Sequence, residues 1–208
     1  MADYISDALV RRLPVYFRHL QDLKASGVTQ ISSQELGERI GFTPSQIRQD
    51  INSFGGGGKQ GYGYDVAELM EIIRELLDMN REHRMAIIGA GRVGCAIAEY
   101  RNFRLGGFRT VGMFDAAPVK DSVKGIPVWP MEELEKQLPR LDVSIVALAV
   151  PASAAQEILD RVYRLGIRGF WNFAPVDLKY PPDAAVVSVH LSDSLCMLSY
   201  RLKQMENS

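Results

Sequence analysis

Apolar residues recur at helical spacing in the first part of the chain. Between Tyr4 and Ala25 they fall at three- and four-residue steps and form one stripe: Ile5, Leu9, Leu13, Phe17, Leu20 and Leu23. Pro14 interrupts the stripe, because proline removes a hydrogen bond from a helix interior. The pattern therefore predicts a first helix that is kinked, or broken into two short helices, at this proline.

Two shorter helices are expected next. The first covers Ser32–Ile40, where a serine and a glutamate three residues later have the spacing of a capping box. Thr43 then precedes Pro44–Ser53, and a threonine cap followed by proline at the first helical position is typical of a helix start. A turn of only a few residues separates the two helices, as in a helix-turn-helix.

A glycine-rich segment and a fourth helix complete this first part. Gly55–Gly63 holds six glycines in nine residues and cannot be a helix or packed core. Asp65 begins a helix that is expected to reach about Asn80, with an apolar side facing the core. We place the domain boundary at residues 80–83, so that residues 1–80 form a winged-helix domain.

From Arg84 onward, short apolar strands alternate with helical segments. The expected strands are Met85–Gly89, Thr110–Phe114, Val143–Val150, Gly169–Phe173 and Val186–Val189, with a helix at Ala152–Arg164. Continuous apolar strands separated by helices indicate a parallel sheet covered on both faces. Residues 81–190 are therefore expected to form a Rossmann-type α/β domain, and residues 191–208 a C-terminal amphipathic helix and tail.

The sequence after the first of these strands has the spacing of a dinucleotide-binding turn. Gly89, Gly91 and Gly94 form a GxGxxG motif between a strand and a helix, which is the context that the motif requires. The motif segment is Gly89, Ala90, Gly91, Arg92, Val93 and Gly94. Asp115 ends the next strand 21 residues after Gly94, where a carboxylate binds ribose hydroxyls and repels a 2′-phosphate. The site is therefore predicted to bind NAD(H) rather than NADP(H), although such a turn can also serve packing alone.

Two later segments leave strands at the same edge of the predicted sheet. They are Val150 and Pro151 after one strand, and Asn172, Phe173, Ala174 and Pro175 after the next. Small apolar groups with one amide are suited to a nicotinamide pocket, but ordinary strand-to-helix turns have the same composition. We identify no catalytic residue, and a domain of this size leaves little room for a substrate fold. The nucleotide is therefore expected to act as a signal.

The third helix presents polar side chains that suit the reading of DNA. Ile47 and Ile51 are expected to face inward, which leaves five side chains directed outward: Ser45, Gln46, Arg48, Gln49 and Asn52. Arginine recognises guanine, glutamine and asparagine recognise adenine, and serine pairs with either. Lys59 and Tyr62 in the glycine-rich segment suit a wing that touches phosphates or enters a minor groove. Such a face can also be merely solvated.

Charge and composition modify this picture. The 208 residues carry a net charge of −1, and residues 1–84 hold 10 Lys or Arg against 12 Asp or Glu, whereas most DNA-binding domains are basic. The chain shows no bilayer-spanning apolar run and no signal peptide, so a cytoplasmic protein without a membrane partner is expected. Cys95 and Cys196 fit no metal-ligand spacing; they are expected to be buried and inert, with a redox disulfide as the alternative.

Taken together, the motifs resemble the Rex family of bacterial redox-sensing transcriptional repressors. The similarity covers nearly the whole chain and is carried by Arg12–Arg18, Gln46–Asp50, Phe54–Gly55, Gly61–Tyr64, Gly89–Gly94, Phe114–Asp115, Ala149–Pro151, Ala154–Gln156, Asn172–Pro175 and Leu198–Tyr200. The resemblance implies a repressor that is not an enzyme and a homodimer whose C-terminal helix is swapped into the partner subunit. It also implies that NADH and NAD⁺ compete for one site. The NADH-bound form would leave a palindromic, double-stranded operator and relieve repression of genes for fermentation or anaerobic respiration.

The resemblance also assigns switch residues, and here the chain departs from the family pattern. Arg18, Arg92, Tyr100 and the residue at position 190 would form the polar contacts that differ between the two states. The family usually has an aspartate where His190 stands, so an arginine–carboxylate contact is missing here. A histidine at this position is expected either to form a hydrogen bond or to make the switch sensitive to pH near neutrality. Gln49 replaces a usual basic residue, and the wing at Gly55–Gly58 is featureless. A small NAD-dependent oxidoreductase and a nucleotide-gated protein-interaction module remain the alternatives.

Overall fold

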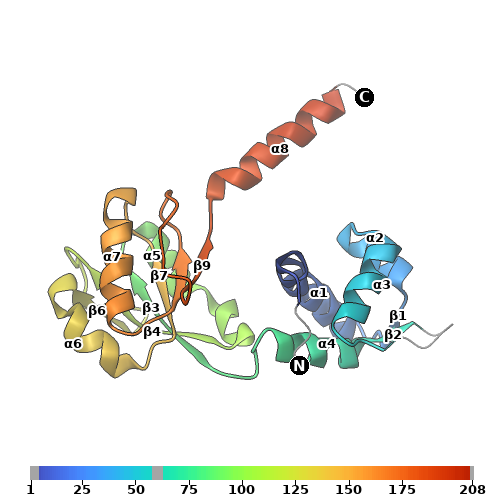
Figure 1. Ribbon diagram of the computed structural model, residues 1–208, viewed down its shortest axis with the longest axis horizontal. Coiled ribbons are helices and arrows are strands. Elements are labelled where there is room, and N and C mark those ends of the chain that lie inside the picture. Colours follow the sequence, from blue (N-terminus) through green and yellow to red (C-terminus); the bar gives the residue numbers. More distant parts are fainter. Residues whose placement is uncertain (1–4, 58–62, 207–208) are drawn as a thin grey trace. The chain divides into compact units, whose positions relative to one another are not determined.

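The computed structural model describes residues 5–57 and 63–206 of the chain. By its internal contacts the chain divides into two compact units, Met1–Arg81 and Glu82–Ser208 (Figure 1). Lys59 and Tyr62, which the sequence assigns to the wing, lie outside the described residues. No described helix has the length and apolar character that crossing a membrane requires.

The first unit is a small helical bundle with a two-stranded ribbon. Its elements are α1 (Asp7–Ala25), β1 (Gln30–Ile31), α2 (Ser33–Ile40), α3 (Pro44–Ser53), β2 (Tyr64–Asp65) and α4 (Val66–Leu76). The two strands pair antiparallel, with Ile31 opposite Tyr64. One core contains the inward stripes of all four helices. β1 precedes α2 and α3, and β2 follows the glycine-rich segment, which is consistent with the order of elements in a winged helix.

Local sequence determines where α2 and α3 begin. Ser32 accepts a hydrogen bond from the backbone N–H of Glu35, and the Glu35 carboxylate accepts one from the backbone N–H of Ser32, so the capping box is complete. Gly41 ends α2 with φ at 78°, a left-handed conformation that favours glycine. Thr43 accepts from the backbone N–H of Gln46 and caps α3. The predicted starts and ends of these two helices are confirmed.

Two expectations for the first unit need correction. α1 is one continuous helix that contains Pro14, so the alternative of two short helices is wrong, and Leu13 before the proline and Tyr16 after it are both buried in the same core. α4 ends at Leu76 rather than at Asn80, since the chain turns at Asp78, whose φ is 51°. Aspartate tolerates this left-handed conformation better than most residues do, so the helix can end without a glycine.

The second unit is built on a seven-stranded sheet in the order β5-β6-β4-β3-β7-β8-β9. Its strands are β3 (His83–Ile88), β4 (Phe108–Asp115), β5 (Ser122–Val123), β6 (Ile126–Pro130), β7 (Ile145–Leu148), β8 (Gly169–Asn172) and β9 (Ala185–Ser188). Its helices are α5 (Arg92–Glu99), α6 (Leu134–Gln137), α7 (Ala152–Arg164) and α8 (Leu191–Glu206), with 3-10 turns at Arg101–Gly106, Met131–Glu133 and Leu138–Leu141. All pairs are parallel except β5 with β6.

An apolar core lies on each face of this sheet. Ala86 and Ile88 of β3 pack with α6 and α7 on one face, whereas Met85 and Ile87 pack with α5 on the other. This alternation explains why β3 is apolar without interruption. The chain moves from β3 to β4 on one side and returns to β7 on the other. The strand order therefore reverses next to β3, where ligands bind in open α/β sheets.

The predicted elements of this unit agree with the structure to different degrees. α7 has the predicted bounds, and the five predicted strands are all present with ends shifted by one or two residues. The edge strands β5 and β6 were not anticipated, because two prolines interrupt the apolar pattern of β6. None of the described residues of α8 is buried, although its Leu195, Leu198 and Tyr200 are apolar or aromatic.

Candidate functional site

The turn after β3 places its three glycines in different surroundings. Gly89 has a φ of 101°, and a Cβ added there would lie 2.2 Å from the carbonyl oxygen of Ala149. A Cβ on Gly94 would lie 1.8 Å from the carbonyl oxygen of Gly89, so α5 packs directly on the turn. At Gly91 nothing lies within 4 Å of an added Cβ. The fold itself therefore requires the first and third glycines but not the middle one.

The open side of Gly91 is where backbone amides are available. Gly91 is the N-cap of α5, and no side chain caps this helix. The first turn of a helix carries unpaired N–H groups and the positive end of the helix dipole, and both favour a phosphate. A glycine that packing does not need, placed at this terminus, lets a dinucleotide pyrophosphate approach the backbone closely. The site therefore fits the cofactor that the sequence predicts.

Asp115 lies beside the same turn. It is the last residue of β4, and its carboxylate accepts hydrogen bonds from the backbone N–H of Ala90 at 2.6 Å and of Ala117 at 2.9 Å. Two backbone donors hold the half-buried carboxylate against the glycine turn, in position to accept hydrogen bonds from ribose hydroxyls. The structure thus brings together Asp115 and the glycine motif, which are far apart in the sequence.

The loops after β7 and β8 leave the sheet at the same edge, but their side chains differ from expectation. Asn172 is fully buried; its Nδ2 donates to the carbonyl of Val176 and to Ser188 Oγ, and its Oδ1 accepts from the N–H of Ala174. Both protons of this amide are used within the protein, so Asn172 shapes the loop, and its contact with the nicotinamide stays a prediction. Ala174 is also buried, whereas Val150 and Phe173 are half-buried and Pro151 and Pro175 are exposed.

The predicted switch residues lie in both units. Arg18 is exposed on α1 of the first unit, and Arg92 is exposed at the first position of α5 in the second. Tyr100 is 54% exposed and its ring packs against Phe103. His190 is half-buried, with Nε2 at 3.8 Å from a carboxylate oxygen of Asp177. A carboxylate therefore lies near His190.

The outward face of α3 matches four of the five predicted DNA-reading residues. Ser45, Arg48, Gln49 and Asn52 are exposed. The guanidinium of Arg48 donates to Ser33 Oγ at 3.1 Å and to Ser45 Oγ at 3.2 Å. Two hydroxyls from α2 and α3 therefore orient the one cation on this face of the described helix.

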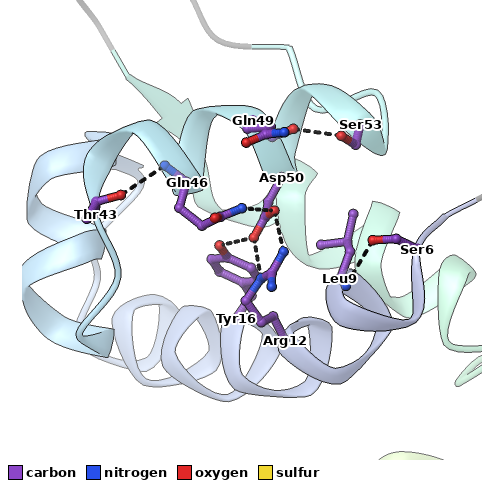
Figure 2. Close-up of polar contacts among 9 residues, drawn as sticks. All are labelled: Ser6, Leu9, Arg12, Tyr16, Thr43, Gln46, Gln49, Asp50 and Ser53. Carbon is purple, nitrogen blue, oxygen red and sulfur yellow. Dashed lines mark hydrogen bonds and ion pairs between the residues drawn. The ribbon is translucent and has the colours of Figure 1, made fainter.

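Gln46 is the exception, because it reaches into a buried polar cluster (Figure 2). It is half-buried, and its Nε2 donates to Asp50 Oδ1 at 2.8 Å. Arg12 donates to both oxygens of Asp50 at 2.7 Å, and the Tyr16 hydroxyl donates to Oδ2 at 2.7 Å. The Asp50 side chain is only 3% exposed. The cluster therefore fixes α3 against α1 through one carboxylate.

These contacts also determine the charges in the cluster. Burial is the largest influence on the pKa of Asp50 and would raise it, but the hydrogen bonds from Arg12, Tyr16 and Gln46 together hold this pKa below its ordinary value. The pKa of Arg12 is raised, mainly by its hydrogen bond to Asp50. The pKa of Tyr16 is raised by burial and by the same carboxylate. Near neutral pH, Asp50 and Arg12 are ionised and Tyr16 is a neutral donor.

Comparisons with known proteins agree with both sites. Residues 4–52 match the family described as "Putative DNA-binding protein N-terminus", and residues 80–176 match the "CoA binding domain" family. The redox-sensing transcriptional repressor Rex of Thermoanaerobacter sp. is 45% identical over 204 residues, which is 97% of this chain and 91% of that protein. Rex of Clostridium perfringens is 46% identical over 200 residues, or 95% and 94% of the two chains. The chain belongs to the Rex family of redox-sensing transcriptional repressors.

Solved structures of a Rex-family repressor, RSP, have the same fold. The crystal structure of RSP in complex with β-NAD⁺ and operator DNA matches with a TM-score of 0.90, 44% identity, and coverage of 98% of this chain and 94% of that one. The complex of RSP with β-NADH matches with a TM-score of 0.89, 43% identity, and coverage of 97% and 96%. The predicted fold class and the prediction of a transcriptional regulator rather than an enzyme are confirmed.

Two features of this Rex-family chain escaped the sequence analysis. The expectation of two buried thiols is wrong for Cys196, which is exposed on α8, whereas Cys95 is half-buried and donates to the carbonyl of Ala90. The cluster of Arg12, Tyr16 and Asp50 was not anticipated as a unit. Its signal is the position of Asp50, which shares the inward stripe of α3 with Ile47 and Ile51. A carboxylate in an apolar stripe indicates a buried partner. Among the described residues no group of side chains forms a metal site.

Proposed function

We propose that this chain is a cytoplasmic repressor that binds palindromic operator DNA as a homodimer and leaves it when NADH replaces NAD⁺. The observation that carries the proposal is the glycine turn, where Gly91 is open and no packing requires a glycine, beside a carboxylate held by backbone donors. The likeness to RSP, which has been crystallised with β-NAD⁺ and operator DNA and with β-NADH, supports the same pairing of ligands for this chain.

The nucleotide would be held by the residues at the carboxyl edge of the sheet. Gly89–Gly94 would offer backbone amides to the pyrophosphate, and Asp115 would accept from the ribose hydroxyls and repel a 2′-phosphate. Val150, Pro151 and Phe173 would line the nicotinamide end, in a loop whose shape Asn172 maintains. NAD(H) supplies hydride chemistry in dehydrogenases, but we assign no residue of this chain to a reacting carbon, and the ligand acts here through binding.

The first unit would contact the operator. Ser45, Arg48, Gln49 and Asn52 face outward on α3 and can pair with base edges in the major groove. The dimer assignment is supported by α8, because an isolated amphipathic helix of this length is marginal in water and none of its described side chains is buried. A partner subunit would cover these apolar side chains, which include Leu195 and Leu198.

Sensing requires that the two oxidation states bind two dimer arrangements with different affinities. A ligand that binds both arrangements equally shifts nothing, however tightly it binds. We assign the contacts that differ between the arrangements to Arg18, Arg92, Tyr100 and His190. The resemblance gives an aspartate at the position of His190. His190 is half-buried near Asp177, and we expect its ring to supply the hydrogen bond that the aspartate would make.

The test is fluorescence anisotropy of a labelled operator duplex with the full chain. NAD⁺ is held at a fixed concentration while NADH is raised across physiological ratios, and the fraction of bound duplex is expected to fall. A parallel titration with NADPH is the matched control, and it should leave the duplex bound because Asp115 repels the 2′-phosphate. If the bound fraction stays constant throughout the NADH titration, the protein is not a sensor of this kind.

A further inference from the structure

The Asp50 carboxylate accepts four hydrogen bonds, and one of them comes from a residue on the DNA-facing side of α3. Arg12 and Tyr16 of α1 supply three of these bonds, and Gln46 supplies the fourth from the first turn of α3 (Figure 2). A carboxylate has about four acceptor positions, so this set of donors fills it. Gln46 is therefore a bridge between the buried cluster and the exposed face of the helix.

The charge of Asp50 decides which end of the Gln46 amide faces it. An ionised carboxylate only accepts hydrogen bonds, so the amide must turn its Nε2 inward, as it does at 2.8 Å from Oδ1. The reverse orientation would place the amide oxygen against a negatively charged oxygen and lose the bond. The lowered pKa of Asp50 keeps this preference intact at neutral pH. Glutamine amides at a solvated surface have no such constraint.

The other end of the amide is free to meet DNA. Within the described residues, every buried side-chain nitrogen or oxygen has a hydrogen-bond partner. The Oε1 of Gln46 has no partner among these residues, so by the same rule it is not a buried atom. With the amide nitrogen held by Asp50, the oxygen is the end of the Gln46 amide that stays available to a ligand of α3.

We propose that Asp50 sets the base preference of α3 by holding Gln46 with its amide oxygen outward, so that Gln46 reads a base that carries an amino group. This inference rests on the proposed operator binding. In the major groove, adenine presents its N6 amino group and cytosine its N4 amino group, whereas guanine and thymine present oxygen acceptors at the corresponding positions. Asp50 touches no base in this scheme. It is a positioning residue that acts through Gln46.

The experiment compares base preferences rather than overall affinities. Duplexes bound by the full wild-type chain are selected from a randomised pool, and Gln46→Ala identifies the base pair that depends on this side chain. Each base pair carries its amino group on only one of its two bases, so we expect this pair to be selected in one orientation, with adenine or cytosine on one strand preferred over thymine or guanine on that strand by about fivefold or more. Asp50→Asn, whose amide both donates and accepts, lets Gln46 turn over, so the preference at this pair should fall below about twofold while the other pairs keep theirs.

Tyr16→Phe is the matched control, because Tyr16 donates to Oδ2 whereas Gln46 donates to Oδ1. It should lower the unfolding midpoint and leave the base preference unchanged. A loss of preference at every position in Asp50→Asn, or an equal change in Tyr16→Phe, would mean that the cluster is merely structural, and the proposal would be wrong. NADH binding and circular dichroism of each variant verify that both units are folded.

Gln46→Glu tests the same inference without changing Asp50. Glutamate cannot donate to Asp50 and is repelled by it, so its carboxylate should turn away from Asp50 with acceptors only. It should still prefer the orientation that carries an amino group at that pair, with weaker binding to all duplexes because it repels phosphates. Equal use of both orientations of that pair by the wild type, or no dependence on Gln46 at any pair, would overturn the inference while the repressor function stands. Failure of the wild type to select any duplex would overturn both.

Discussion

Replacing Gly91 with alanine separates what the glycine turn does for the fold from what it does for the ligand. The φ of Gly91 is −74°, an ordinary value for any residue, and nothing lies within 4 Å of the new Cβ. Reduced freedom of the unfolded chain would stabilise the variant by about 0.4–1 kcal/mol. Alanine is a poorer N-cap than glycine by a similar amount, so the two effects nearly offset each other. The unfolding midpoint should move by no more than about 3 °C.

The affinity for NADH should respond very differently. The methyl group would occupy the space through which the pyrophosphate reaches the amides at the start of α5. Loss of one charge-assisted hydrogen bond weakens binding by about 1.5–3 kcal/mol, or roughly 10- to 100-fold. The dissociation constant is measured from NADH fluorescence, and stability by thermal unfolding followed by circular dichroism. Gly91→Ala should therefore have near-normal stability and poor NADH binding.

Gly94→Ala is the matched control, because its Cβ would lie 1.8 Å from the carbonyl oxygen of Gly89. Atoms in contact are normally about 3.5–4 Å apart, so α5 must move away from the turn. This variant should lose both stability and affinity. The reasoning would be refuted if Gly91→Ala bound NADH within twofold of the wild type, because the open side of the turn would then not be the phosphate site.

Further predictions concern the other residues singled out above. Arg48→Ala should weaken operator binding by about 1–3 kcal/mol in anisotropy titrations and leave NADH fluorescence unchanged. Asp115→Ala should weaken NADH binding and reduce discrimination against NADPH, while operator binding without nucleotide stays as in the wild type. Arg12→Ala leaves a buried carboxylate without its cation and should destabilise the first unit by about 3–5 kcal/mol in urea, whereas Arg11→Ala, at an exposed position, should change stability by less than about 0.5 kcal/mol. Because the folded pKa of Asp50 is below its unfolded value near 3.9, its contribution is present above that pH and is lost as the pH falls through the folded pKa, so acid unfolding of the first unit below about pH 4 should be less steep in Asp50→Asn.

The elements that the sequence predicts well are those defined by local signals. α7 has an apolar stripe and a clear change of pattern at each end, and the capping residues of α2 and α3 fix their starts to one residue. The end of α4 depends instead on a left-handed turn at Asp78, and the sequence has no glycine there to predict it. β6 contains two prolines, so only its pairing with β4 and β5 identifies it as a strand. Tertiary context decided both.

The geometry of the glycine turn and its carboxylate was predictable because backbone geometry restricts the residue types there. The close approach between α5 and the turn excludes a side chain at Gly94. The end of β4 is the position from which the Asp115 carboxylate reaches the turn. The types of both residues can therefore be predicted from the sequence. Asn172 was assigned to the ligand because its position at the sheet edge was visible, whereas its three internal hydrogen bonds were not. The position of a residue along a strand is predictable, but the hydrogen-bond partners of its polar side chain are not.

α3 shows that the exposed residues of a helix cannot be predicted without knowing the polar residues on its buried side. Apolar spacing correctly put Ile47 and Ile51 inside, and five polar residues, Gln46 among them, were then placed outside. Asp50 lies between these two isoleucines on the same stripe, so it is buried, and its need for donors draws Gln46 inward as well. Arg12 and Tyr16 meet that need from α1, at positions whose spacing also faces the core. The outward chemistry of a recognition helix is therefore set partly by its buried polar residues, because they decide which atoms of their neighbours remain available to DNA.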